Sequence, residues 1–253
     1  MNSLPASVCK LAGPSSEERM PGTGQACKMS GEERTTEADF GVTFFARLSC
    51  SWAKVGRSMA DGSTEIPVPE FMSACQELSN IYDCLGSFLS PAKKDMVAIL
   101  GVLEAGSYNG ADTVQGIVRA DIEGRRCFRD NKDRKGLSFN LLWLTRALRF
   151  ILTLLRNIDR DNVDFASKEC SDCARDAYGS TIKPYHGWMM SGTFGVMMGQ
   201  VPNRSAFMGD LALSCSEEQA YAELVQFVAL AEPHVNAVHQ FYLDNGLNDP
   251  WVA

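Results

Sequence analysis

The 253-residue sequence contains only three histidines, and no window reaches the roughly 18 apolar residues that a membrane-spanning helix needs. We therefore expect no transmembrane segment. The first residues carry early glutamates and no long apolar stretch, which argues against a secretory signal and a transit peptide. Walker loops, GxSxG turns and HExxH helices are also missing, and no identifiable catalytic set remains. These absences predict a protein that is not an enzyme.

A cysteine framework is missing as well. The nine cysteines are odd in number and scattered, so we predict reduced thiols in a cytosolic protein and no disulfides. Cys170 and Cys173 form a CxxC pair, but no second pair completes a zinc site, and His234 and His239 lack patterned ligands around them. No metal and no cofactor are expected. A thiol enzyme that uses Cys170 or Cys173 with a histidine is the least favoured alternative.

The excess of positive charge that nucleic-acid binding favours is likewise absent. The formal net charge is −7, with 24 Lys and Arg against 31 Asp and Glu. Nucleic acid is therefore not an expected partner. Apolar residues make up 45% of the chain and charged residues 22%, which is typical of a globular protein with a packed core.

The chain divides into a polar tail and a helical domain. Residues 1–39 are rich in Ser, Glu, Gly, Pro and Thr without apolar periodicity, so we expect a disordered tail there and one domain over 40–253. Apolar residues at spacings of three and four then predict helices, and no alternating pattern predicts a strand, so the expected class is all-α. The predicted helical segments are about 44–55, 69–84, 90–105, 139–158, 167–199, 216–231 and 233–246.

Local signals mark several of these helix ends. Gly86 can supply a left-handed cap after the second segment, and Ser90 followed by Pro91 has the pattern of a capped helix start. The segment 139–158 is apolar around most of its circumference, which is typical of a central core helix.

Three polar or aromatic residues are candidates for binding, each with a structural alternative. Asp95 shares a helix face with Ile99 and Val102, so its carboxylate requires a partner if that face is buried; otherwise it is a solvated first-turn residue. Trp143 lies in the most apolar segment and His186 stands between two aromatic residues. Core packing is the alternative for both.

Three segments, LSPAKKDM, LLWLTRALRFI and PYHGW, occur in the order of the signature motifs of the glycolipid transfer protein family, which the chain resembles from about residue 40 to its end. The segment EIPVPEFMSACQELSNIYDCLGS is also similar to the plant accelerated-cell-death proteins of the ceramide-1-phosphate branch. The resemblance implies a two-layer helical sandwich that parts to admit lipid chains, with a polar recognition centre at its mouth. The expected ligand is one sphingolipid per chain.

The resemblance also implies roles for the candidate residues. Asp95 matches the aspartate that bonds the sphingoid amide, and His186 matches the histidine that bonds the acyl carbonyl. Trp143 matches the tryptophan that stacks on the first sugar of a glycolipid. Ile99 and Val102 replace the asparagine and lysine of the glycolipid branch, so the sugar-hydroxyl clamp is missing and a simple glycosylceramide is the expected ligand.

The basic cluster of the phosphate branch would fall on Ile99, Phe139 and Trp143, none of which can neutralise a phosphate, so ceramide-1-phosphate is disfavoured. Trp188 matches a tryptophan that docks on the bilayer, and Tyr185 is a second candidate there. The expected protein transfers or senses a sphingolipid in the cytosol and contacts membranes transiently at their surface. A scaffold or adaptor with the same fold and without transfer activity is the alternative, and its protein partner is unknown.

Overall fold

A computed structural model describes residues 41–58, 64–106, 108, 110–131 and 135–248 of the chain. The predicted tail at 1–39 lies outside the described residues. Over the part that is described, the protein is all-α, as predicted, apart from two-residue strands β1 (Arg57–Ser58) and β2 (Thr64–Glu65) that pair antiparallel. The helices are α1 (Phe44–Trp52), α2 (Val68–Leu78), α3 (Ile81–Cys84), η2 (Ser87–Leu89), α4 (Ser90–Glu104), α5 (Val114–Glu123), α6 (Phe128–Asn131), α7 (Leu137–Ile158), α8 (Cys170–Thr181), η3 (Lys183–Tyr185), α9 (Trp188–Met198), α10 (Arg204–Ala212) and α11 (Glu217–Asp244).

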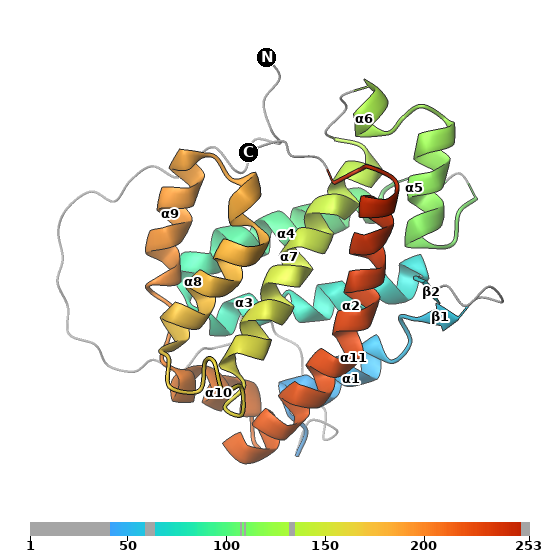
Figure 1. The fold of residues 1–253 in the computed structure, drawn as a ribbon. Coiled ribbons are helices and arrows are strands. Elements are labelled where there is room, and N and C mark those ends of the chain that lie inside the picture. Colours follow the sequence, from blue (N-terminus) through green and yellow to red (C-terminus); the bar gives the residue numbers. More distant parts are fainter. Residues whose placement is uncertain (1–40, 59–63, 107, 109, 132–134, 249–253) are drawn as a thin grey trace.

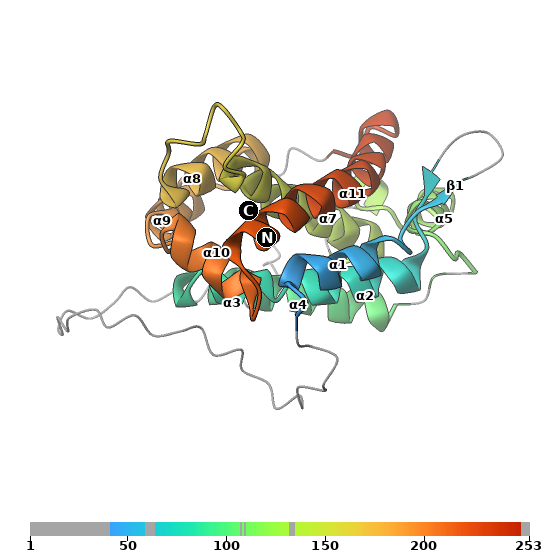
Figure 2. The ribbon, with the colours of Figure 1, turned by 90° about the horizontal axis from the view of Figure 1, so that it is seen from below.

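The helices form two layers. Figure 2 shows α8, α7 and α11 in one layer and α1, α2, α3 and α4 in the other, with α9 and α10 at one end. Helix α7 lies at the centre and contacts α8 and α11 within its own layer and α4 in the layer opposite (Figure 1). The apolar core fills the space between the layers.

Helix α7 is the core helix that the sequence predicts. By length and composition alone it would also pass as a membrane span, with a mean hydropathy of 1.3 over its most apolar window. Two thirds of that window, 67%, is buried against the other helices. The apolar circumference of α7 is therefore used for packing on four neighbouring helices, α4, α5, α8 and α11.

An aromatic cluster joins α1 to both layers. The indole of Trp52 is fully buried, and its ring centroid lies 6.3 Å from that of Phe71 on α2 and 6.1 Å from that of Phe227 on α11, both edge-to-face. Such pairs add to the stabilisation from burial alone. At the start of α1 the hydroxyl of Thr43 accepts a hydrogen bond from the amide of Ala46, which satisfies one free N–H of the first turn.

Several elements differ from the sequence prediction. Helices α5, α6 and α10 were not predicted, and the segment 167–199 is divided into α8, η3 and α9. The second segment breaks into α2 and α3 around Ser79, whose amide ends α2 and whose side chain bonds the carbonyl of Gln76. Ser90 is the first residue of α4 and forms no side-chain cap, because the preceding turn, η2, is already a 3-10 helix. The two C-terminal segments form one helix, α11, that continues through Pro233. Pro233 is exposed, so its ring is turned away from the core.

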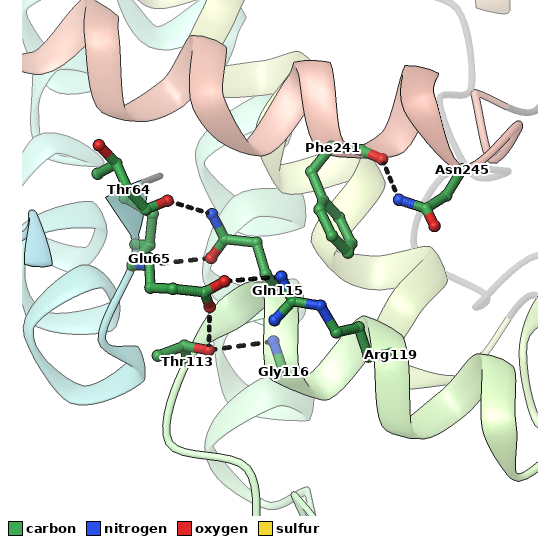
Figure 3. Close-up of polar contacts among 9 residues, drawn as sticks. Thr64, Glu65, Thr113, Gln115, Gly116, Arg119, Phe241 and Asn245 are labelled. Carbon is green, nitrogen blue, oxygen red and sulfur yellow. Dashed lines mark hydrogen bonds and ion pairs between the residues drawn. The ribbon is translucent and has the colours of Figure 1, made fainter. Parts of the chain in front are cut away.

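The short strands tie α5 to the rest of the fold through buried polar contacts (Figure 3). The carboxylate of Glu65 accepts hydrogen bonds from the Thr113 hydroxyl at 2.6 Å and from Arg119 at 2.7 Å. The guanidinium of Arg119 also lies 5.0 Å from the ring centroid of Phe241 on α11. Gln115 exchanges hydrogen bonds with the backbone of Thr64 and Ile66. This network fixes the end of the sandwich next to α5.

Arg204, the first residue of α10, holds the loop between α7 and α8. Its guanidinium donates hydrogen bonds to the carbonyl oxygens of Ile158, of Phe165 at 2.8 Å and of Lys168 at 3.0 Å. Ile158 ends α7, so its carbonyl has no partner within that helix. One side chain therefore satisfies three backbone acceptors and closes the core helix.

We expect Arg204→Met to reduce the free energy of unfolding by about 2–4 kcal/mol, because three carbonyl groups lose a charged donor. Urea unfolding followed by circular dichroism measures this change. As a control, Arg175→Met removes an exposed ion pair with Asp172 and should cost less than about 1 kcal/mol. Equal losses in the two variants would contradict the role given to Arg204.

Candidate functional site

The structure brings Trp143 and His186 together. The ring of His186 stacks on the indole of Trp143, with a centroid distance of 6.0 Å and an angle of 22° between the planes. Trp143 comes from the middle of α7, and His186 follows the 3-10 turn η3, which contains Pro184. The backbone of His186 is extended before Gly187 begins α9, so the imidazole is directed toward α7. Both side chains are half-buried.

The polar atoms and the charge state of His186 are set by its neighbours. The hydroxyl of Tyr178 on α8 lies 3.0 Å from Nδ1 of the imidazole, and Phe194 on α9 contacts the ring at a centroid distance of 4.8 Å. Burial, together with the nearby positive charge of Arg146, lowers the pKa of His186 to about 4. The imidazole is therefore neutral at physiological pH and has one donor and one acceptor nitrogen.

Arg146, which the sequence analysis did not single out, lies in the same cluster. It is only 1% exposed. Its guanidinium carbon lies 3.5 Å from the ring centroid of Tyr185 and 4.9 Å from that of Trp143. One of its nitrogens donates a hydrogen bond of 3.2 Å to the side-chain oxygen of Asn248, whose amide also bonds the hydroxyl of Tyr185. A buried cation is thus held between two aromatic faces beside the candidate site.

Phe139 forms the apolar wall next to Trp143. It is buried one turn earlier on α7, and its ring makes edge-to-face contacts with Phe128 at 5.4 Å and with Trp143 at 6.3 Å. An aromatic ring in this position restricts the indole and keeps that side of the centre dry.

Asp95, Ile99 and Val102 lie on α4, which packs against α7. The core-facing stripe of α4 is formed by Met96 and Leu100 together with Leu103, so the three predicted residues occupy the neighbouring stripe at the edge of the core. Ile99 is half-buried, whereas Val102 is 42% exposed and does not face inward as expected. The buried stripe of α4 is narrow, and Val102 lies outside it.

The carboxyl group of Asp95 is half-buried, and burial raises its pKa to about 6. Tyr82 on α3 is buried. Its pKa is raised mainly by this burial and also by the negative charge of Asp95. Asp95 is the sixth residue of α4, and its carboxyl group is partly removed from water.

The two predicted docking residues differ in their surroundings. Trp188 is 85% exposed at the start of α9, and Met189 and Val196 on the same helix are 65% and 68% exposed. Tyr185 instead packs inward on Arg146 and bonds Asn248, because its ring covers the buried guanidinium. Tyr185 therefore belongs to the cluster around Arg146, whereas Trp188 is open to solvent.

The remaining candidates show no reactive chemistry. Burial raises the pKa of Cys170 to about 12 and raises that of Cys173, whose thiol donates to the carbonyl of Asn157 at 3.3 Å. Neither thiol is a ready nucleophile at neutral pH. Within the described ranges no group of three or more His, Cys, Asp or Glu side chains is placed to hold a metal ion.

An all-helical two-layer fold with an aromatic and imidazole centre at its edge defines a class of non-enzymatic lipid carriers, and the comparisons identify the family. The chain belongs to the glycolipid transfer protein family, whose profile matches residues 66–213. This membership confirms the predicted fold and the expectation that the protein is not an enzyme.

Individual relatives agree with this assignment. Glycolipid transfer protein 1 of Arabidopsis thaliana is 26% identical over 188 residues, which cover 73% of this chain and 88% of that protein. Two solved structures share the fold at 22% identity and a TM-score of 0.70. One is the domain through which FAPP2 selects simple glycosphingolipids, and it covers 84% of this chain and is itself matched over its whole length. The other is a variant of Arabidopsis accelerated-cell-death 11 in complex with ceramide-1-phosphate, which covers 83% of this chain and is also matched completely.

The neutrality of His186 has a measurable consequence for pH. The pKa of His186 falls from 6.5 in the unfolded chain to about 4 in the folded protein. Between these two pH values the folded state therefore binds fewer protons than the unfolded state. His186 thus contributes stability that is fully present above pH 6.5 and is lost as the pH falls toward 4. We expect ¹⁵N NMR to record a neutral His186 ring at pH 5.5. A midpoint near 6.5 would contradict the desolvation described here.

Proposed function

We propose that this protein binds one sphingolipid with a small sugar head group and carries it between membranes. The observation that carries the proposal is the stack of Trp143 on a neutral His186 at the edge of the helical sandwich. An indole face suits the apolar face of a sugar, and a neutral imidazole can donate one hydrogen bond to an amide carbonyl.

The ceramide amide requires both an acceptor and a donor. With the hydroxyl of Tyr178 donating to Nδ1 of His186, the ring proton lies on Nε2, which we assign as the donor to the acyl carbonyl. Asp95 would accept from the amide N–H and from the neighbouring hydroxyl group. Its raised pKa of about 6 means that this carboxylate is ionised at neutral pH and protonates as the pH falls below 6. Lipid affinity should decline over the same range.

The side chains around Trp143 favour a sugar over a phosphate. Phe139 and Ile99 are apolar, and Trp143 occupies the position where the phosphate branch has an arginine. The cation of Arg146 lies 4.9 Å from the indole, but its guanidinium is enclosed between Trp143 and Tyr185 and bonded to Asn248. A phosphate monoester would need an accessible guanidinium fork. The apolar residues Ile99 and Val102 favour a head group of one sugar.

Helix α9 supplies a surface suited to the membrane interface. Its sequence from Trp188 to Met198 contains no charged residue, and Trp188, Met189 and Val196 are exposed on it. An indole is favoured at the boundary between headgroups and acyl chains because it has both an apolar body and an N–H donor. We infer that a cytosolic protein docks transiently through α9, so that the lipid leaves the bilayer near His186.

One observation favours a second candidate function. Ile99 and Val102 offer no hydrogen bonds to sugar hydroxyls, and a protein that keeps the fold without transfer could serve as a lipid-sensing scaffold or adaptor. Extraction and mass spectrometry of the purified protein separate the two possibilities. A co-purifying sphingolipid supports transfer, and a lipid-free protein in a stable complex with another protein supports the scaffold.

We expect Trp143→Ala and Asp95→Val each to reduce transfer of labelled galactosylceramide between vesicles by about 100-fold, since the first removes the proposed stacking face for the sugar and the second removes the proposed acceptor for the ceramide amide. Ceramide and ceramide-1-phosphate, assayed in parallel, should be transferred more slowly by the unaltered protein. Circular dichroism provides the control, because both side chains are only half-buried and helicity should persist. Faster transfer of ceramide-1-phosphate than of galactosylceramide would overturn the assigned head group.

We expect Trp188→Ala to weaken binding to phosphatidylcholine vesicles by about tenfold, because most of an exposed indole is lost from the interface. Vesicle sedimentation measures the change. The matched control is Val163→Ala, a 90% exposed apolar residue in the loop between α7 and α8. If both variants bind vesicles as strongly as the unaltered protein, α9 is not the docking surface.

A further inference from the structure

A polar cavity of about 240 Å³ lies between α7 and α11, one turn beyond the recognition centre. The two helices pack against each other and lie side by side in Figure 1. The lining residues are three, four and seven apart on α7 and three and four apart on α11, which is the spacing of one helix face. The lining consists of Arg149, Leu152, Thr153 and Arg156 from α7 and Glu232, Val235 and Asn236 from α11.

The charged groups of the cavity leave one positive charge in excess. Arg156 forms an ion pair with Glu232, with a nitrogen–oxygen distance of 2.8 Å, so these two charges offset each other. Arg149 is half-buried and donates to Nε2 of His239 at 2.9 Å. Burial and the charges of Arg149 and Arg146 lower the pKa of His239 to about 4, so this acceptor is neutral and takes up no charge from Arg149.

The bond between His239 and Arg149 also has a cost. Because Nε2 accepts from the guanidinium, the imidazole proton lies on Nδ1, which is buried and has no hydrogen-bond partner among the described residues. A buried unpaired N–H reduces stability, and such arrangements are typical of functional sites. The bond orients the guanidinium plane and leaves its other N–H groups available on the side of the cavity.

From this geometry we propose that the cavity between α7 and α11 is a second binding site, for a small phosphate or carboxylate anion. Arg149 supplies the charge and a fork of N–H donors, which matches the oxygens of such an anion. The hydroxyl of Thr153 and the amide of Asn236 add uncharged donors on the two walls. The volume is below that of a typical pocket for a drug-sized molecule and suits a phosphate group with a few waters.

The site is separate from the proposed sphingolipid centre and does not depend on it. It lies close enough to act on it, because the charges of Arg149 and Arg146 both lower the pKa of His239, and the guanidinium of Arg146 lies over the rings of Tyr185 and Trp143. An anion on Arg149 would therefore change the field at Arg146 beside Trp143.

Binding of inorganic phosphate tests the proposal directly, by ³¹P NMR or calorimetry at constant ionic strength. We expect saturable binding of one phosphate per chain, weakened about tenfold or more in Arg149→Gln because the charged donor is lost. Asn236→Asp places a negative charge at the cavity without removing the bond between Arg149 and His239, and it should weaken binding to a similar extent. The matched control is Arg160→Gln, which removes an exposed arginine just beyond α7 and should leave binding unchanged.

A second arm distinguishes a free anion from a lipid headgroup. A short-chain phosphatidic acid is titrated in place of phosphate, against the same three variants. Binding of phosphatidic acid alone, with loss in Arg149→Gln and Asn236→Asp, supports the site with a headgroup as its ligand. The proposal is overturned if neither anion binds saturably, or if Arg160→Gln weakens binding as much as Arg149→Gln does. Thermal unfolding of each variant shows whether it is folded, and Asn236→Asp keeps the test decisive if Arg149→Gln does not fold.

Discussion

The buried guanidinium of Arg146 constrains the whole region around the candidate site. A charge that is removed from water costs several kcal/mol unless nearby groups compensate for it. Among the described residues, Trp143 on the same helix, Tyr185 from η3 and Asn248 after α11 contact this guanidinium. The cation therefore determines how the η3 turn and the end of the chain lie on α7, and through them where His186 is held.

The same arrangement determines the protonation of the imidazole. Arg146 is close enough to lower the pKa of His186, and burial by Phe194 and Tyr178 acts in the same direction. A protonated ring beside the guanidinium would be repelled and poorly solvated, so the neutral form is strongly favoured. Trp143 can then stack on an uncharged ring that keeps one hydrogen-bond donor for a ligand. Arg146 therefore contributes both to the charge state of His186 and to the packing of the aromatic rings around it.

The sequence predicted the fold class and the central helix because these depend on the periodicity of apolar residues. A common binding centre for Trp143 and His186 was implied only by the family resemblance, because no local pattern shows that the two side chains meet. The sequence did not predict Arg146, although an arginine three residues after Trp143 in an apolar run must share its face, and that spacing was the available signal. The continuation of α11 through Pro233 was missed because an exposed proline ring loses one hydrogen bond without disturbing packing. Val102 is exposed because α4 buries a different stripe of its surface against α7. The sequence of α4 alone does not determine which stripe is buried.

In the proposed function, the residue that binds the lipid amide, His186, and the residue that contacts the membrane, Trp188, are separated only by Gly187. His186 is directed inward onto Trp143, Gly187 begins α9, and Trp188 is exposed to solvent. Phe194, one and a half turns later on α9, contacts the ring of His186 and stacks on Tyr178 with an interplanar angle of 13°. Because packed aromatic rings transmit displacement instead of absorbing it, α9 cannot shift without altering the contacts of the imidazole. In the proposed function, the insertion of Trp188 into a bilayer and the release of the amide carbonyl from His186 are thus parts of one movement.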